Sequence, residues 1–166
     1  MTRRAGGDFM DLVIGYGNDL RGDDAAGRLV VGRVAGRAVA GAEILSVHQL
    51  TPELATQVAG ADRIVFVDAY VATPGDITRV ERVTGDGVDP PLGHVGGPHS
   101  LLRLSETLYG RRPDAWMVMV PALGFDFGAD PSSTTLAGIA DAVAHVEGLL
   151  AGSLAPSEET QGVCTR

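Results

Sequence analysis

The chain has 166 residues, of which 45% are hydrophobic, and its formal net charge is −8 at pH 7. A chain of this length and composition can bury one substantial core, so we expect a single globular domain. Its acidic charge lacks the positive surface that nucleic acids and anionic membranes attract, which argues against both as partners.

The first half of the chain predicts alternating strands and helices. Residues 1–9 precede the first apolar run and are either a flexible extension or an upstream start, with Met10 as the true one. Apolar runs and helical spacing of apolar residues then indicate the elements. In chain order, these are a strand at 12–14, an amphipathic helix over 24–38, a strand at 43–47, a short helix over 52–58 and a strand at 64–67 that closes at Asp68.

The second half continues the alternation and ends in a polar tail. Its elements are an edge strand at 77–83, a glycine-rich loop over 84–98, a helix over 99–109, a buried strand at 116–120 and a final helix marked by apolar residues from Leu136 to Leu150. We expect one α/β domain over 10–151 and disorder over 152–166. The order of elements predicts a three-layer sandwich with a mainly parallel sheet of about five strands between helices.

Three side chains capable of chemistry should meet at one edge of this sheet. Asp24 follows the glycine turn after the first strand, Asp68 closes the central strand, and His99 opens the helix after the glycine-rich loop. Ligands of such sheets bind beyond the carboxyl ends of the strands. Two carboxylates and an imidazole form a donor set suited to a borderline divalent metal such as nickel or zinc.

Each of these residues also has a structural explanation. Asp23 and Asp24 suit a helix N-cap and first turn, Asp68 suits a turn after a strand, and His99 suits an exposed or capping position. Their predicted convergence at one edge is what favours a site. The other histidines are expected to be structural or solvated (His48 and His94) or to lie away from this edge (His145).

Several common chemistries are excluded by the residues that are missing. The sequence contains no Lys, which removes P-loop and Schiff-base lysines, and its one cysteine, Cys164, lies in the polar tail. The turn that starts at Gly15 lacks the third glycine of a dinucleotide fingerprint, since Leu20 stands there, and an acidic pair would face the phosphates. No run reaches the roughly 18 apolar residues of a membrane span, and we expect a soluble cytoplasmic protein.

The motifs resemble those of the nickel-iron hydrogenase maturation endopeptidases. That family's pattern is a first strand, Gly-x-Gly-Asn, a few residues, an acidic pair and a glycine, found here as 15–18, Asp23-Asp24 and Gly27. The similarity continues through the segments at 50–54, 65–69, 99–102 and 108–110, and it covers roughly residues 12–150. Two departures are Ala25, where the family often has glycine, and the shorter Asp24, where many members have glutamate.

The resemblance implies a fold and a function. It implies a twisted five-stranded sheet between helices and a protease that removes the C-terminal extension of a hydrogenase large-subunit precursor after nickel insertion. It also implies that Asp24, Asp68 and His99 recognise the nickel and act in catalysis. The nickel would arrive with the substrate, and no tightly bound cofactor of the protein itself is expected.

Two other functions remain open at this stage. One is a non-catalytic, metal-dependent checkpoint that binds the same precursor through the same residues without cutting it. The other is a small-molecule-binding α/β domain with a carboxylate-lined pocket. The oligomeric state cannot be read from the sequence.

Overall fold

A computed structural model of the chain describes residues 9–37, 39, 41–89 and 96–152. These residues form one five-stranded sheet in the order β2-β1-β3-β5-β4. Four of the strands are parallel, and the edge strand β4 runs antiparallel to β5. This confirms the predicted mainly parallel sheet of five strands. The strands are β1 (Asp11–Tyr16), β2 (Ala42–Val47), β3 (Arg63–Val71), β4 (Arg79–Val83) and β5 (Asp114–Ala122).

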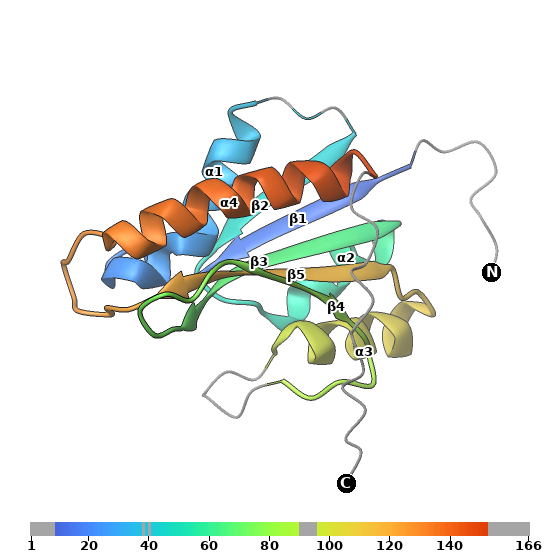
Figure 1. Cartoon of the computed structure of the whole chain (residues 1–166). Helices are drawn as coiled ribbons and strands as arrows, with labels where there is room; N and C mark the ends of the chain where they lie inside the picture. The colour runs from blue at the N-terminus through green and yellow to red at the C-terminus, as the bar shows by residue number, and fades with distance from the viewer. Residues whose placement is uncertain (1–8, 38, 40, 90–95, 153–166) are drawn as a thin grey trace, which may run out of the picture.

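Helices cover both faces of the sheet, which gives the predicted three layers. The main helices are α1 (Ala26–Ala35), α2 (Ala55–Gly60), α3 (Pro98–Tyr109) and α4 (Ser133–Leu150), and short 3-10 turns, η1 (Gly22–Ala25) and η2 (Pro52–Leu54), lead into the first two. Helices α1 and α4 lie on one face, and α2 and α3 lie on the other (Figure 1). The two predicted terminal segments, 1–9 and 152–166, lie outside the described residues apart from Phe9 and Gly152.

Two apolar cores, one on each face, explain the uniform hydrophobicity of the central strands. Val65 and Val67 of β3 pack in the core beneath α1 and α4. Ile64 and Phe66 pack in the core beneath α2 and α3. A strand covered on both faces has no exposed side and so shows no polar alternation. Continuing the alternation places Asp68 on the α2 and α3 side of the sheet.

The structure corrects three details of the predicted elements. Strand β3 does not close at Asp68 but runs to Val71, because its last residues still pair with the equally long β5. The helix predicted over 24–38 is divided into η1 and α1, so Asp24 lies in a 3-10 turn. The helical spacing of Leu101, Leu104 and Leu108 predicts one apolar stripe on this helix, but Leu108 is 59% exposed.

The crossover connections create a switch point between β1 and β3. The chain passes from β1 through α1 to β2 on one side, and the strands that follow β3 lie on the other side of it. Loops that leave the sheet in opposite directions open a crevice at the carboxyl ends of the two strands, where ligands of such sheets bind. Asp24 follows β1, and Asp68 lies in β3.

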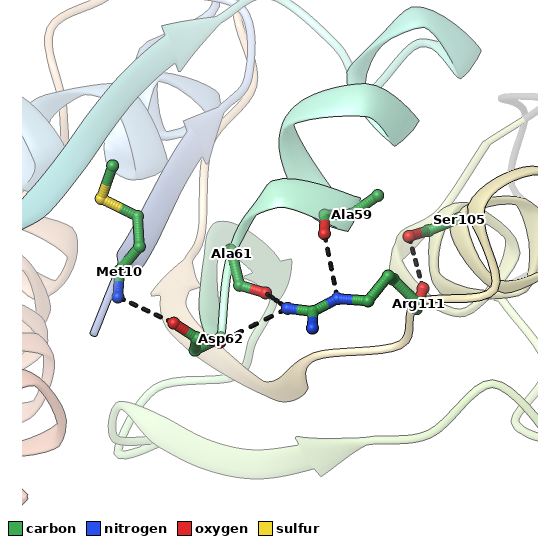
Figure 2. A network of polar contacts seen from close by, with 6 residues as sticks. All are labelled: Met10, Ala59, Ala61, Asp62, Ser105 and Arg111. Atoms are coloured by element: carbon green, nitrogen blue, oxygen red, sulfur yellow. Dashed lines mark hydrogen bonds and ion pairs between the residues drawn. The ribbon is translucent and has the colours of Figure 1, made fainter. Parts of the chain in front are cut away.

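A polar network closes the opposite, amino-terminal edge of the sheet (Figure 2). The Arg111 guanidinium donates to the carbonyl oxygens of Ala59 at 3.3 Å and Ala61 at 3.2 Å, and to the Asp62 carboxylate at 3.4 Å. Asp62 in turn accepts from the Met10 backbone N–H at 3.0 Å. These bonds join the segments that enter β1, β3 and β5, far from the switch point.

Within the described residues, no helix is long and apolar enough to cross a membrane.

A glycine contact brings α1 close to the two central strands. A Cβ atom added at Gly27 would lie 2.3 Å from the carbonyl oxygen of Val67 and 2.4 Å from that of Tyr16. One added at Gly15 would lie 2.2 Å from the Gly27 carbonyl oxygen. Real Cβ atoms do not approach backbone oxygens this closely, so only glycine fits at either position. The first turn of α1 therefore rests directly on the end of β1 and on the middle of β3.

Gly27→Ala should destabilise the fold, because the new methyl group must push α1 away from the strands. We expect a loss of about 2–3 kcal/mol in the free energy of unfolding. Gly32→Ala in the same helix is the matched control, since nothing lies within 4 Å of its added Cβ. That change should stabilise the protein by roughly 0.5–1 kcal/mol. Urea unfolding measures both, and equal stabilities of the two variants would contradict the contact.

Candidate active site at the carboxyl edge of the sheet

The turn between β1 and α1 is wound tightly enough to face Asp24 towards the sheet. Gly17 has a φ of 137° and lies against the turn, since a Cβ there would be 2.0 Å from the Asp24 carbonyl oxygen. The Asn18 backbone N–H donates to the Asp24 carboxylate at 2.9 Å. Asp24 therefore has a fixed position, and its side chain is only half-buried.

The adjacent Asp23 has a structural role. It is 1% exposed, and its carboxylate accepts bonds from the backbone N–H groups of Leu123 at 2.7 Å, Gly124 at 3.0 Å and Ser132 at 2.5 Å, and from the Ser132 hydroxyl at 2.9 Å. Burial alone would raise the pKa of Asp23, but these hydrogen bonds outweigh it and the pKa is lowered. Asp23 thus ties η1 to the end of β5 and to the start of α4. The acidic pair divides into one structural residue and one residue available to a ligand.

Asp68 is the electrostatically unusual residue of this edge. The pKa of its carboxyl group is raised from 3.8 to about 7, mainly by burial and also by the nearby charge of Asp24, while hydrogen bonds from the Ala69 N–H and Tyr16 act in the opposite direction. The Ala69 bond measures 2.7 Å. A carboxyl group with a pKa near neutrality can both accept and release a proton under ordinary conditions. The charge of Asp24 acts on Asp68, so these two carboxylates lie near each other at this edge of the sheet.

Tyr16 belongs to this site and was missed by the sequence analysis. Gly15 pairs with Val67 in the parallel register of β1 and β3, so the next residues, Tyr16 and Asp68, lie side by side. Burial and the charge of Asp68 raise the pKa of Tyr16 well above its ordinary value, and the two side chains form a hydrogen bond. Tyr16 therefore stays protonated and donates. The alternation that continues from Ile14 in β1 would have placed it on this face.

His99 lies in the first turn of α3 and contacts the segment before it. Its Nδ1 atom bonds to the Thr84 carbonyl oxygen, and its ring lies against Gly87, where an added Cβ would be 2.2 Å from Nδ1. A carbonyl oxygen has no proton to give, so Nδ1 carries the proton and Nε2 keeps its lone pair. Histidines that bind metals use this arrangement, with one nitrogen donating to the protein and the other free for the metal.

The three predicted residues are not assembled as a metal site. Among the residues that the structure describes, no three His, Cys, Asp or Glu side chains are grouped closely enough to hold a metal ion. The structure places Asp24 beside Asp68, while His99 remains bound to Thr84. A metal site that uses all three residues therefore stays a prediction.

Two other histidines of the described residues lie outside this group. His48 is exposed, and its backbone carbonyl accepts from Gly17 N–H at 3.2 Å. His145 lies in α4, on the opposite face of the sheet from α3. His94 falls outside the described residues.

Asp23→Ala should destabilise the protein by about 3 kcal/mol, because it leaves three part-buried backbone N–H groups and the Ser132 hydroxyl without their common acceptor. Asp24→Ala should cost less than about 1 kcal/mol, since that carboxylate accepts a single hydrogen bond. Urea unfolding of the two variants compares them directly. Similar losses for both would contradict the division of roles within the pair.

Asp68 should make the protein less stable as the pH rises. The folded protein holds this proton up to a pKa of about 7, whereas the ordinary value is 3.8. The stability that the protonated group contributes is therefore fully present below about pH 4 and is lost as the pH rises through 7. Asp68→Asn avoids this loss and should be more stable than the wild type above pH 8, by up to about 4 kcal/mol.

Urea unfolding between pH 4 and 9 measures this difference. The gain from Asp68→Asn should be large at pH 9 and close to zero at pH 4. Asp141→Asn, which replaces an exposed carboxylate on α4, is the control and should show no such trend. A gain that does not depend on pH would contradict the raised pKa of Asp68.

Comparison with known proteins identifies the fold. No protein-family model matches the sequence, and no curated protein sequence matches it significantly. Solved structures do match. One is the NiFe hydrogenase maturation protease HycI from Thermococcus kodakarensis KOD1, with a TM-score of 0.67, 21% identity, and coverage of 89% of this chain and 94% of that chain.

Two further structures agree with the first. The hydrogenase maturating endopeptidase HybD from E. coli has a TM-score of 0.66 and 24% identity over 87% of this chain and 94% of that chain. The hydrogenase 2 maturation peptidase from Thaumarchaeota archaeon SCGC_AB-539-E09 has a TM-score of 0.63 and 18% identity over 87% and 99%. The chain therefore has the fold of the NiFe hydrogenase maturation proteases, as the sequence resemblance predicts.

Proposed function

We propose that the protein is an endopeptidase that removes the C-terminal extension of a NiFe hydrogenase large-subunit precursor after nickel insertion. The observation that carries this proposal is the pair of Asp24 and Asp68 at the switch point of the sheet, where the pKa of Asp68 is raised to about 7. The three solved proteins compared above are a maturation protease, an endopeptidase and a maturation peptidase, which supports peptide hydrolysis. In this proposal the protein acts in the cytoplasm, without nucleic acid or membrane.

We further propose that Asp24, Asp68 and His99 recognise nickel carried by the substrate. Two carboxylate oxygens and the Nε2 atom of His99 form a mixed oxygen and nitrogen donor set that suits a borderline divalent metal. The precursor supplies the remaining ligands, so the protein needs no cofactor of its own. The ion itself joins His99 to the two carboxylates when the loaded precursor binds, and an unloaded precursor lacks that ion.

The chemistry of the cut follows from the same groups. Peptide hydrolysis needs a base to take a proton from water and an acid to give one to the departing amine. Asp68 suits both steps because its pKa lies near neutrality. Substrate-borne nickel can either polarise the scissile carbonyl group or activate the water, and both routes use the same three residues.

Incubation of the protein with a nickel-loaded precursor should shorten that precursor by its C-terminal extension. Intact-mass spectrometry follows the change, and a nickel-free precursor should keep its mass. A precursor that is bound tightly but never shortened would contradict the protease and support a non-catalytic checkpoint. A protein that neither binds nor cuts the precursor would contradict both.

Asp24→Ala, Asp68→Ala and His99→Ala should each lower the rate of cutting by at least about 100-fold, while the protein stays folded. His48→Ala is the control, because it removes an exposed imidazole near the same turn. The rate of that variant should equal the wild-type rate. Normal cutting by all three site variants would show that the site lies elsewhere.

A further inference from the structure

The start of α3 lacks a cap from its own sequence. Gly97 occupies the N-cap position and has no side chain to accept a hydrogen bond, and Pro98 follows it. The backbone N–H groups of the first helical turn need acceptors, which a serine, threonine, asparagine or aspartate at the N-cap usually supplies. The turn left uncapped in this way is the one that carries His99.

Asp89 supplies the missing cap from outside the helix. One of its carboxylate oxygens accepts from the His99 N–H at 2.9 Å, and the other accepts from the Ser100 N–H at 2.9 Å. The side chain fits because residue 97 is glycine, since an added Cβ there would lie 2.3 Å from the Asp89 Cγ atom. Asp89 and Gly97 are therefore matched to each other.

The segment that carries Asp89 is also bonded to α3 at other points. The Arg103 guanidinium donates to the carbonyl oxygens of Gly85 at 2.9 Å and Gly87 at 2.7 Å. The His99 ring meets Thr84 and Gly87 of the same segment. The backbone of His99 and its ring are thus held by one segment, with Asp89 fixing the backbone and Thr84 fixing Nδ1.

We infer that Asp89 is the positioning residue for His99, and that it orients the ring so that Nε2 is presented as the free nitrogen. This inference rests on the proposed function in one respect, which is that Nε2 of His99 binds the nickel carried by the substrate. If the cap is lost, the first turn of α3 can fray and the contact of Nδ1 with Thr84 is no longer enforced. The side chain of His99 then samples both tautomers, and the share with a free Nε2 falls.

Three variants separate this role from general stability. Asp89→Ala removes the distant cap. A double variant, Asp89→Gly combined with Gly97→Ser, moves the cap to the N-cap position, where the serine hydroxyl can accept from the same His99 or Ser100 N–H. Glycine is used at position 89 because the Asp89 Cβ atom itself would lie 2.7 Å from the Cβ atom that the serine adds. Asp86→Ala is the matched control, because it removes a 91% exposed carboxylate from the same segment.

The decisive measurement is the ¹⁵N NMR signature of the His99 ring nitrogens in the folded protein, together with the kcat and KM for a nickel-loaded precursor. The wild type and Asp86→Ala should show a protonated Nδ1. Asp89→Ala should lose that signature and lower kcat/KM by about tenfold. The double variant should regain both. A purely structural cap would lower the unfolding temperature but leave the His99 signature of the folded protein unchanged.

Two results would overturn the inference. One is an Asp89→Ala protein that folds with the wild-type signature and cuts normally. Another is a double variant that recovers stability without recovering the signature, because Asp89 would then act by some means other than capping. If the wild type cuts no precursor, the proposed function fails. The ring-nitrogen signature alone then decides the role of Asp89, and an unchanged signature in Asp89→Ala would contradict that role.

Discussion

The close contact between α1 and the central strands is the constraint on which the site depends. Gly15 and Gly27 let the helix rest on the end of β1 and the middle of β3 at a distance that no side chain permits. Because η1 runs directly into α1, this contact also fixes where the preceding turn lies. Asp24 is thereby brought to the switch point, where Asp68 comes from β3. The glycines do not bind a ligand themselves; they set the position of a carboxylate.

The carboxylate pair destabilises the folded protein, and the groups around it partly offset that effect. Burial disfavours the charge on Asp68, and the Asp24 carboxylate adds repulsion. Tyr16 and the Ala69 N–H return some stabilisation through hydrogen bonds. A strained or unfavourable group that the rest of the structure holds in place is typical of a functional site. Asp23, one residue earlier, is fully satisfied by hydrogen bonds and adds stability instead.

The site is assembled from two units with different supports. Asp24, Asp68 and Tyr16 are placed by the sheet and by the helix that packs on it. His99 is placed by α3, which packs in the same core as the central strands, and by hydrogen bonds from the segment that ends at Asp89. A substrate-borne ion that binds both would join them.

Much of the fold was predictable because its signals are local. Apolar runs marked the strands, and the glycine turn with its acidic pair predicted Asp24 beside the sheet edge. The extension of β3 beyond Asp68 was not predictable, since it depends on pairing with β5, some 50 residues later. The role of Asp89 was not predictable for a similar reason. It caps a helix that begins nine residues further on, and no sequence motif marks a cap at that distance.

The spacing of residues along the sequence also gave one wrong prediction, at Leu108, and left one site residue, Tyr16, unrecognised. The helical spacing of leucines assigned Leu108 to the core of α3, but the buried face of that helix turns towards Ser105 instead. Tyr16 was readable from the alternation of β1, yet its importance depends on the register with β3, which sequence spacing does not reveal. Positions set by pairing between distant segments are the ones that sequence alone leaves open.

The most direct measurement of the central claim is a crystal structure of the protein soaked with Ni²⁺. The proposed site predicts one ion that contacts carboxylate oxygens of both Asp24 and Asp68 and the Nε2 atom of His99, with Nδ1 still bonded to Thr84. An ion that binds elsewhere, or that contacts the two carboxylates while His99 stays apart, would contradict it.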